Sequence, residues 1–373
     1  MTQFPAAREM DMPAALKPSN FSDLPGWDDC DPGPVLDALR QCAGYASSVK
    51  PYRTGAFGLS MEDFGSIFDD VRSVGALSGQ AARRFFKDRF QVFRIDTPGH
   101  VTGYYEPEIE VSPHRTDRFR FPFHRRPDDL IDLDATNRPH GMDSSFCYGR
   151  NEGGRITEYP DRRQIDQGFL DGRGFEIAWA ASRVDVFFIH VQGSARLNFP
   201  DGAVRRITFA AKTGHEYTSI GKELLALGVF RPGEATMTGI RDWFDRHPDR
   251  VEDILWRNRS YIFFREAPVY DPAAGPIAAA KTPLTAMHSL AVDRKLHTFA
   301  TPFFVSAPEL THLTGEPFRR LMLAQDTGSA ILGPARGDIF VGCGDKAGEL
   351  AGSVNHRATF YMLAPNIAAD RYR

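Results

Sequence analysis

The first quarter of the chain carries apolar residues at the three- and four-residue spacing that is typical of amphipathic helices. The segment from Pro34 to Tyr45 is predicted to be a helix, with apolar positions at Val35, Leu36, Leu39 and Cys42. Two more helices are predicted, around Ser60 to Val71 and around Ser78 to Asp88. Residues 1–25 are instead rich in proline, alanine and polar residues, and they are predicted to form a mobile arm.

After these helices the pattern changes to one of strands. From Phe90 to Val111, β-branched and aromatic residues alternate around glycine and proline, which predicts strands joined by turns. Short strand candidates continue to about Glu266; they include Phe175–Ala180, Val186–Gln192, Ala203–Phe209 and Tyr261–Phe264. This spacing favours a β-rich barrel or sandwich.

A few helices are expected to interrupt these strands. Asp161 to Gln164 has the pattern of a capping box, so a short helix should begin there. Ser219 to Ala226 is predicted to be a helix that ends at Gly228. The run from Thr238 to Asn258 should hold two helices that are broken at Pro248.

Length and charge narrow the class of protein. At 373 residues the chain exceeds the usual size of one hydrophobic core, so we expect two domains. With 45 basic and 48 acidic residues the net charge is only −3, and nucleic acid is not expected as a partner. A basic cluster at Phe119–Pro127 is predicted to be a solvated loop, although it could touch an acidic polymer.

The start of the chain lacks the basic region and apolar run of a secretory signal, and no stretch is apolar enough for a transmembrane helix. Either the protein is cytosolic or this chain begins after a removed leader. Cys30 and Cys42 are close enough in sequence to be bridged, and whether they are stays open. Neither a Cys-x-x-Cys nor a His-Glu-x-x-His spacing occurs, so no metal site is expected.

The most informative segment runs from Leu321 to Gly344 and holds two aspartates twelve positions apart, Asp326 and Asp338. Both lie at the ends of strand-like apolar runs. Apolar surroundings raise the pKa of a carboxyl group, as an acid catalyst near neutral pH requires. The alternative is that each aspartate caps a turn.

Asp326 also begins an Asp-Thr-Gly-Ser tetrapeptide, which occurs around the aspartates of pepsin-like proteases. Those enzymes need two such aspartates that share a proton, and this chain has one Asp-Thr-Gly. A homodimer could supply the second copy, but the chain is far too long for that design. A protease is therefore not favoured.

Two further motifs suit sugar binding. In Val191–Gly202 a predicted strand ends at Gln192, whose amide can bond hydroxyl groups, and Gly193-Ser194 allows a close backbone approach; the alternative is a tight turn. In Val101–Pro107 the neighbouring Tyr104 and Tyr105 should face opposite sides of a strand, so that one ring is buried and the other can stack on a sugar. Core packing of both rings is the alternative.

Five ordered motifs together resemble one family, that of membrane-bound lytic murein transglycosylase A (MltA). They are VTGYYEPEIEVS, YPDRRQID, VQGSARLNFPDG, NRSYIFFRE and AQDTGSAILGPARGDIFVGCG, and the likeness runs from about Leu24 to Pro365. The last motif is similar to the family's "3D" segment, named for three aspartates, which here would be Asp293, Asp326 and Asp338.

The resemblance implies a mainly β fold with peripheral helices. A double-psi β-barrel domain would be formed by residues 26–105 and 268–373, with the 3D segment at about 285–362. A second, β-barrel-like domain, residues 106–267, would be inserted between them, and a groove between the two domains would bind the glycan strand.

The resemblance also implies the chemistry. The enzyme would cleave the β-1,4 bond between N-acetylmuramic acid and N-acetylglucosamine in peptidoglycan and form 1,6-anhydromuramoyl ends, with Asp338 as acid and then base. Asp326 and Asp293 would support this acid without a cofactor or metal. The expected substrate-binding residues are Thr102, Tyr104, Tyr105, Glu106, Gln192, Gly193, Ser194 and Gly328.

Some features depart from the family pattern. The family shows Gly-Gly-Ala-Ile-Lys-Gly after the second aspartate, whereas here Gly328 precedes Ser329, Leu332 replaces the lysine, and one more residue separates Asp326 from Asp338. The family implies a periplasmic or envelope location, although neither a leader nor a lipid-anchoring cysteine is seen in this chain. We expect a monomer that acts on glycan strands, with a possible association with the outer membrane or cell-wall machinery.

Two other functions stay open. An ordinary glycoside hydrolase would use Asp338 with Asp326 or Glu106 as base and water as acceptor. A wall-binding module similar to expansins would bind glycan without cleaving it.

Overall fold

The structure is a computed structural model, and it describes residues 16–231, 234–269 and 274–373. The chain divides into two compact units. The described part of unit 1 comprises residues 16–103, 277–340 and 354–373, and unit 2 comprises Tyr104–Pro276 and Val341–Ser353. Among the described residues, no helix combines the length and the apolar character needed to cross a membrane.

Six strands of unit 1 pair in a closed ring, in the order β17, β14, β15, β13, β16, β3 and back to β17. Their runs are mostly apolar, and every residue of β13 and β14 is buried, as expected for strands that line a barrel core. The bounds are Gly99–Glu106 (β3), Ser289–Val292 (β13), Pro302–Ala307 (β14), Phe318–Asp326 (β15), Arg336–Cys343 (β16) and Asn355–Pro365 (β17).

The long strand β17 serves three partners. One edge pairs with β14, while the other pairs first with β3, at residues Asn355–Ala358, and then with β2 (Phe90–Ile95). Strand β1 (Leu16–Ser19) pairs in turn with β2.

The mobile arm predicted for residues 1–25 is wrong for the part that the structure describes. Its residues 1–15 lie outside the described residues. Residues 16–19 form strand β1, and Phe21–Asp23 form a short 3-10 turn closed by the side chain of Asp23, which accepts the N–H of Asn20. Edge pairing with β2 therefore outweighs the polar composition that suggested an arm.

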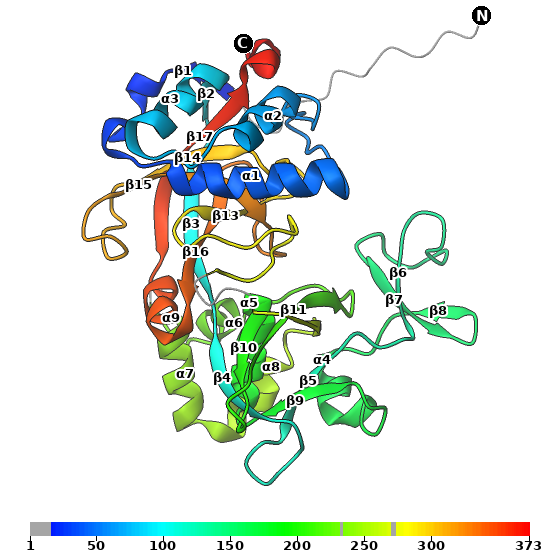
Figure 1. The fold of residues 1–373 in the computed structure, drawn as a ribbon. Helices are drawn as coiled ribbons and strands as arrows, with labels where there is room; N and C mark the ends of the chain where they lie inside the picture. Colours follow the sequence, from blue (N-terminus) through cyan, green and yellow to red (C-terminus); the bar gives the residue numbers. More distant parts are fainter. Residues whose placement is uncertain (1–15, 232–233, 270–273) are drawn as a thin grey trace, which may run out of the picture. The chain divides into compact units, whose positions relative to one another are not determined.

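The three helices predicted near the start are confirmed. They are α1 (Gly33–Ser48), α2 (Gly65–Ser73) and α3 (Gly79–Arg89), and they gather beside one another in unit 1 (Figure 1). The apolar positions predicted for α1 are all buried, at Val35, Leu36, Leu39 and Cys42. This helix packs on α2, α3 and β15.

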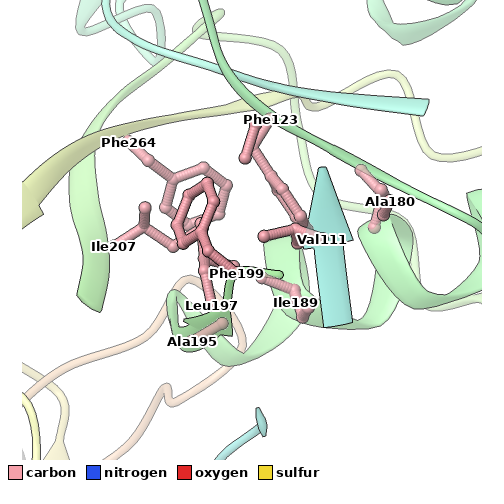
Figure 2. Close-up of a cluster of buried hydrophobic side chains, with 11 residues drawn as sticks. Val111, Phe123, Ala180, Ile189, Ala195, Leu197, Phe199, Ile207 and Phe264 are labelled. Carbon is pink, nitrogen blue, oxygen red and sulfur yellow. The ribbon is translucent and has the colours of Figure 1, made fainter. Parts of the chain in front are cut away.

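Unit 2 contains a six-stranded sheet in the order β12, β11, β10, β4, β9, β5. A bridge between Arg125 and Phe264 brings the two ends of this sheet together. Its core includes Val111, Phe123, Ile189, Leu197, Ile207 and Phe264. Figure 2 shows this cluster, in which the rings of Phe123 and Phe264 meet edge to face with centroids 5.9 Å apart. The bounds are Glu108–Ser112 (β4), Phe121–His124 (β5), Glu176–Ala180 (β9), Ser194–Asn198 (β10), Val204–Lys212 (β11) and Ile262–Ala267 (β12).

The strand predicted at Val186–Gln192 is wrong, because this segment lies in helix α5 (Arg183–Gln192). Five consecutive residues, 186–190, are buried. Val186 and Ile189 join the core of the sheet, whereas Phe187 and Phe188 join a second core formed with other helices. A helix buried on two sides has no polar face, so its periodicity is hidden. Its caps are Ser182, which accepts the N–H of Asp185, and the left-handed Gly193.

The other predicted helices of unit 2 are confirmed. Asp161 forms the capping box of α4 (Arg162–Gln164), α6 spans Ile220–Ala226, and the break at Pro248 separates α7 (Met237–Arg246) from α8 (Val251–Leu255). A small sheet consists of β6 (Leu130–Asp132), β7 (Tyr148–Glu152) and β8 (Arg155–Thr157).

Helix α9 (Gly344–Gly352) belongs to unit 2, although the sequence-based boundaries assigned it to the barrel domain. Its Gly348 approaches the ring of Tyr105 so closely that an added Cβ would lie 2.7 Å from a ring carbon. All four cysteines are free, so Cys30 and Cys42 are not bridged.

Candidate active site

The two aspartates of the informative segment lie on either side of strand β13 in unit 1. Asp338, on β16, pairs with Ala291, and Ala291 pairs on its other edge with Asp326, the last residue of β15. Two strand spacings place their backbones about 10 Å apart. The two aspartates therefore lie in one row across three neighbouring strands of the ring.

Asp338 is half-buried and has one strong hydrogen bond from a neighbouring strand. The hydroxyl of Thr102, on β3, donates to Oδ1 of Asp338 over 2.5 Å. Burial raises the pKa of Asp338 to about 6, the charge of Asp326 adds to this rise, and Thr102 and Arg336 oppose it. Asp338 can therefore hold a proton in mildly acidic solution and release it to a base, as an acid catalyst must.

Asp326 lies beside a buried polar network. Its Oδ1 accepts the N–H of Ala279 over 3.1 Å. The preceding Gln325 is fully buried; its amide accepts from Ser289 and donates to Thr282. These contacts fix the end of β15, and with it the carboxyl of Asp326.

Asp293 is 7% exposed and ties two loops together. One oxygen accepts the N–H of Lys295 over 3.0 Å, and the other accepts the N–H of Gly333 over 2.9 Å. Gly333 follows Gly328 in the loop between Asp326 and Asp338, where the departures from the family pattern occur. In that loop Leu332 is 64% exposed.

Glu106, in unit 2, has both carboxylate oxygens bound. Arg196 donates to Oε2 over 2.9 Å, and Arg206 donates to Oε1 over 2.6 Å and to Oε2 over 2.9 Å. The thiol of Cys343 also donates to Oε2, and burial raises its pKa to about 12. Glu106 is fully buried, so these contacts indicate a structural ion cluster, and they favour neither a catalytic base nor a sugar contact.

The other expected sugar contacts of unit 2 cluster around β3 and α5. Tyr104 and Tyr105 are 9% and 7% exposed, so both rings are buried and the expectation of one exposed ring is wrong. The side-chain oxygen of Gln192 accepts the N–H of Tyr105 over 3.1 Å. Gly193 ends α5, and Ser194 begins β10 as a buried residue.

Three arginines that lie beside Asp338 and Glu106 were not identified from the sequence. Arg336 stands two positions before Asp338 on one strand, so alternation places both on the same face, and this signal could have found it. Arg196 and Arg206 face each other across β10 and β11, a pairing that no local pattern predicts. In the part of the chain that the structure describes, no group of three His, Cys, Asp or Glu side chains is arranged to hold a metal ion.

Two family models match the chain: the MltA specific insert domain at residues 100–265 and the 3D domain at residues 288–364. A curated protein from Escherichia coli (strain K12), named membrane-bound lytic murein transglycosylase A, is 32% identical over 288 residues, which are 75% of this chain and 70% of that protein. This chain belongs to the MltA family. The resemblance found in the sequence is thereby confirmed.

Solved structures of the MltA family share its architecture. A membrane-bound lytic murein transglycosylase from Agrobacterium tumefaciens is 52% identical, with a TM-score of 0.93 over 96% of this chain and 100% of that one. MltA from Neisseria gonorrhoeae is 33% identical, with a TM-score of 0.76 over 94% and 92%. The mostly β fold with additional helices is thus that of MltA.

Proposed function

We propose that this chain is a lytic transglycosylase that cleaves the bond between N-acetylmuramic acid and N-acetylglucosamine in murein, with Asp338 as its only acid and base. Its relatives carry the name lytic murein transglycosylase. The observation that carries the assignment to Asp338 is its half-buried carboxyl with a pKa raised to about 6.

In this mechanism the proton of Asp338 passes to the glycosidic oxygen while the bond from C1 of the muramoyl residue to that oxygen breaks. The resulting carboxylate then accepts the proton of the C6 hydroxyl as O6 bonds to C1. The product is a 1,6-anhydromuramoyl end, and Asp338 is protonated again. Because the nucleophile belongs to the substrate, its effective concentration is high and no protein nucleophile is needed.

The neighbouring residues take supporting parts in this proposal. Asp326 raises the proton affinity of Asp338 by its charge. Asp293 holds the intervening loop, on which Gly328 lies, at Gly333. Thr102 contacts Asp338 directly. We keep the proposal that five residues contact the glycan through backbone groups or ring edges, namely Tyr104, Tyr105, Gln192, Gly193 and Ser194. The contacts of Glu106 favour a structural role instead.

The domain assignment also stays a proposal. We take the closed six-stranded ring as the double-psi β-barrel of residues 26–105 and 268–373, apart from helix α9, which belongs to unit 2. Residues 106–267 would be the inserted domain, a placement supported by the match of the insert family model. A periplasmic location is supported by the membrane-bound relatives, and we propose that the chain acts there as a monomer.

The pH dependence of the reaction tests the acid role. Since only protonated Asp338 can donate, kcat/KM should fall as pH rises through about 6, by about tenfold for each further unit. Initial rates on purified murein from about pH 4 to about pH 9 would measure this. Thermal unfolding over the same range serves as the control, and a rate that stays constant across pH 6 would contradict the assignment.

Product analysis separates the proposal from its rivals. Mass spectrometry of digested murein should show anhydromuramoyl ends. Reducing ends would instead indicate a hydrolase that uses water, and retained glycan binding without released fragments would indicate a wall-binding module.

A further inference from the structure

Arg336, Thr102 and Asp338 form a hydrogen-bonded chain across two strands of unit 1. Arg336 and Asp338 share one face of β16, and Thr102 lies on the neighbouring β3. The Nη2 group of Arg336 donates to the hydroxyl oxygen of Thr102 over 2.7 Å, and that oxygen lies 2.5 Å from Oδ1 of Asp338.

The direction of these hydrogen bonds follows from the groups involved. A guanidinium group has donors only, so Thr102 must accept from Arg336. The hydroxyl of Thr102 donates its single hydrogen to Oδ1 of Asp338. Because Oδ1 is an acceptor, the proton of the acid form resides on Oδ2, and Oδ2 is then the oxygen that can donate it.

The charge of Arg336 adds an electrostatic effect. When Asp338 gives up its proton, the new carboxylate is stabilised by the hydroxyl of Thr102 and by the positive charge behind it. Arg336 also donates to the carbonyl oxygen of Gly337, which fixes its side chain. A weaker acid would transfer its proton more slowly, so this stabilisation acts on the reaction itself.

Other charged or titratable groups face this chain from the strands around it. Asp326 on β15 opposes the ionisation of Asp338, and Arg336 on its own strand favours it. On β3, His100 has its pKa lowered by burial and by Arg336, and on β17 His356 adds to that effect. Neither histidine acts directly on Asp338, so Arg336 is the cation that lowers the pKa of Asp338.

We propose that Arg336 is a positioning residue that acts through Thr102 to keep the reactive proton of Asp338 on Oδ2 and to stabilise the carboxylate left behind. This inference rests on the proposed role of Asp338. It assigns Thr102 to the acid, and not to the sugar.

The test compares pH profiles of kcat and KM on purified murein. For Arg336→Met, kcat at about pH 5 should fall by up to about tenfold, KM should stay unchanged, and the alkaline limb of the profile should move up by about one pH unit, the effect of losing one nearby opposite charge. Thr102→Val should do the same. Arg336→Lys and Thr102→Ser, which keep the charge and the hydroxyl, should restore much of the wild-type profile.

Two controls keep this inference separate from the proposed function. Arg357→Met removes an exposed arginine from the adjacent strand β17 and should leave the profile unchanged. A carboxyl titration followed by ¹³C NMR, with the signal of Asp338 assigned from its loss in Asp338→Asn, should show the upward shift in Arg336→Met without any substrate.

The outcomes are distinct. If Asp338→Asn is inactive but Arg336→Met titrates and reacts like the wild type, the inference on Arg336 is overturned and the role of Asp338 stands. A raised KM with an unchanged kcat in Arg336→Met would overturn it in favour of an arginine that binds an acidic group of the glycan. An active Asp338→Asn variant would instead remove the proposed function itself.

Discussion

Asp338→Asn is expected to lose at least about a thousandfold in kcat on murein while it still binds glycan, because one side chain serves as both acid and base. The amide oxygen can still accept the hydrogen bond of Thr102, so the local structure should be kept. Turnover is measured by release of soluble muropeptides, and glycan binding by sedimentation with murein. Full activity of this variant would refute the role of Asp338.

The stability of the same variant provides an independent check. The pKa of Asp338 is raised in the folded state from 3.8 to about 6, so its contribution to stability is present below about pH 4 and is lost as pH rises through 6. Asparagine cannot ionise and escapes this cost. We therefore expect Asp338→Asn to be more stable than the wild type above pH 6, by up to about 3 kcal/mol.

Urea unfolding at about pH 4 and about pH 8 would measure this difference. Asp117→Asn, at an exposed loop position, is the matched control and should change neither activity nor stability. A variant that gains no stability at the higher pH would show that the carboxyl of Asp338 is not held in a desolvated site.

Glu106→Gln should lower the free energy of unfolding of unit 2 by about 3–5 kcal/mol. Arg196 and Arg206 are 7% and 3% exposed and pair directly across two strands. Glu106 is the carboxylate that both arginines share. Arg196 also pairs with Glu108, so the loss of Glu106 would chiefly leave the buried charge of Arg206 uncompensated beside a second arginine. Urea unfolding, followed by the fluorescence of the tryptophans of unit 2, measures the effect.

Two variants test this explanation of the role of Glu106. Glu110→Gln breaks an ion pair with Arg118 in which both side chains are largely exposed, and it should cost less than about 1 kcal/mol. Adding Arg206→Met to Glu106→Gln removes the uncompensated charge and should recover part of the lost stability. Wild-type stability in Glu106→Gln would mean that the cluster does not hold its strands together.

The sequence predicted those elements whose local pattern agrees with their surroundings. Helix α1 has one apolar face and was recognised from it, and the helix beginning after Asp161 was recognised from its capping box. Helix α5 was missed because its buried residues face two different cores, so that β-branched and aromatic residues dominate it and hide the helical periodicity. Its cap residues, Ser182 and Gly193, were the remaining signal.

The candidate site divides in the same way. Asp338 was singled out because a charge at the start of an apolar strand is a local anomaly. The alternation of side chains along the same strand could also have indicated Arg336. The contact between Thr102 and Asp338 joins residues 236 positions apart, and the pairing of β3 with β16 creates it. The ion cluster of Glu106 likewise depends on the register of β10 and β11, which short motifs do not encode.

The triple pairing of β17 has a consequence for biogenesis. On the ribosome, the strands from β3 to β16 emerge while both of their outer edges are still open, since the strand that joins them is translated after all of them. Unit 1 therefore reaches its native topology only after β17 has been made, long after its partner β3. Until then its unpaired strand edges are exposed to wrong partners, and this interval is when a chaperone would be of most use to the nascent protein.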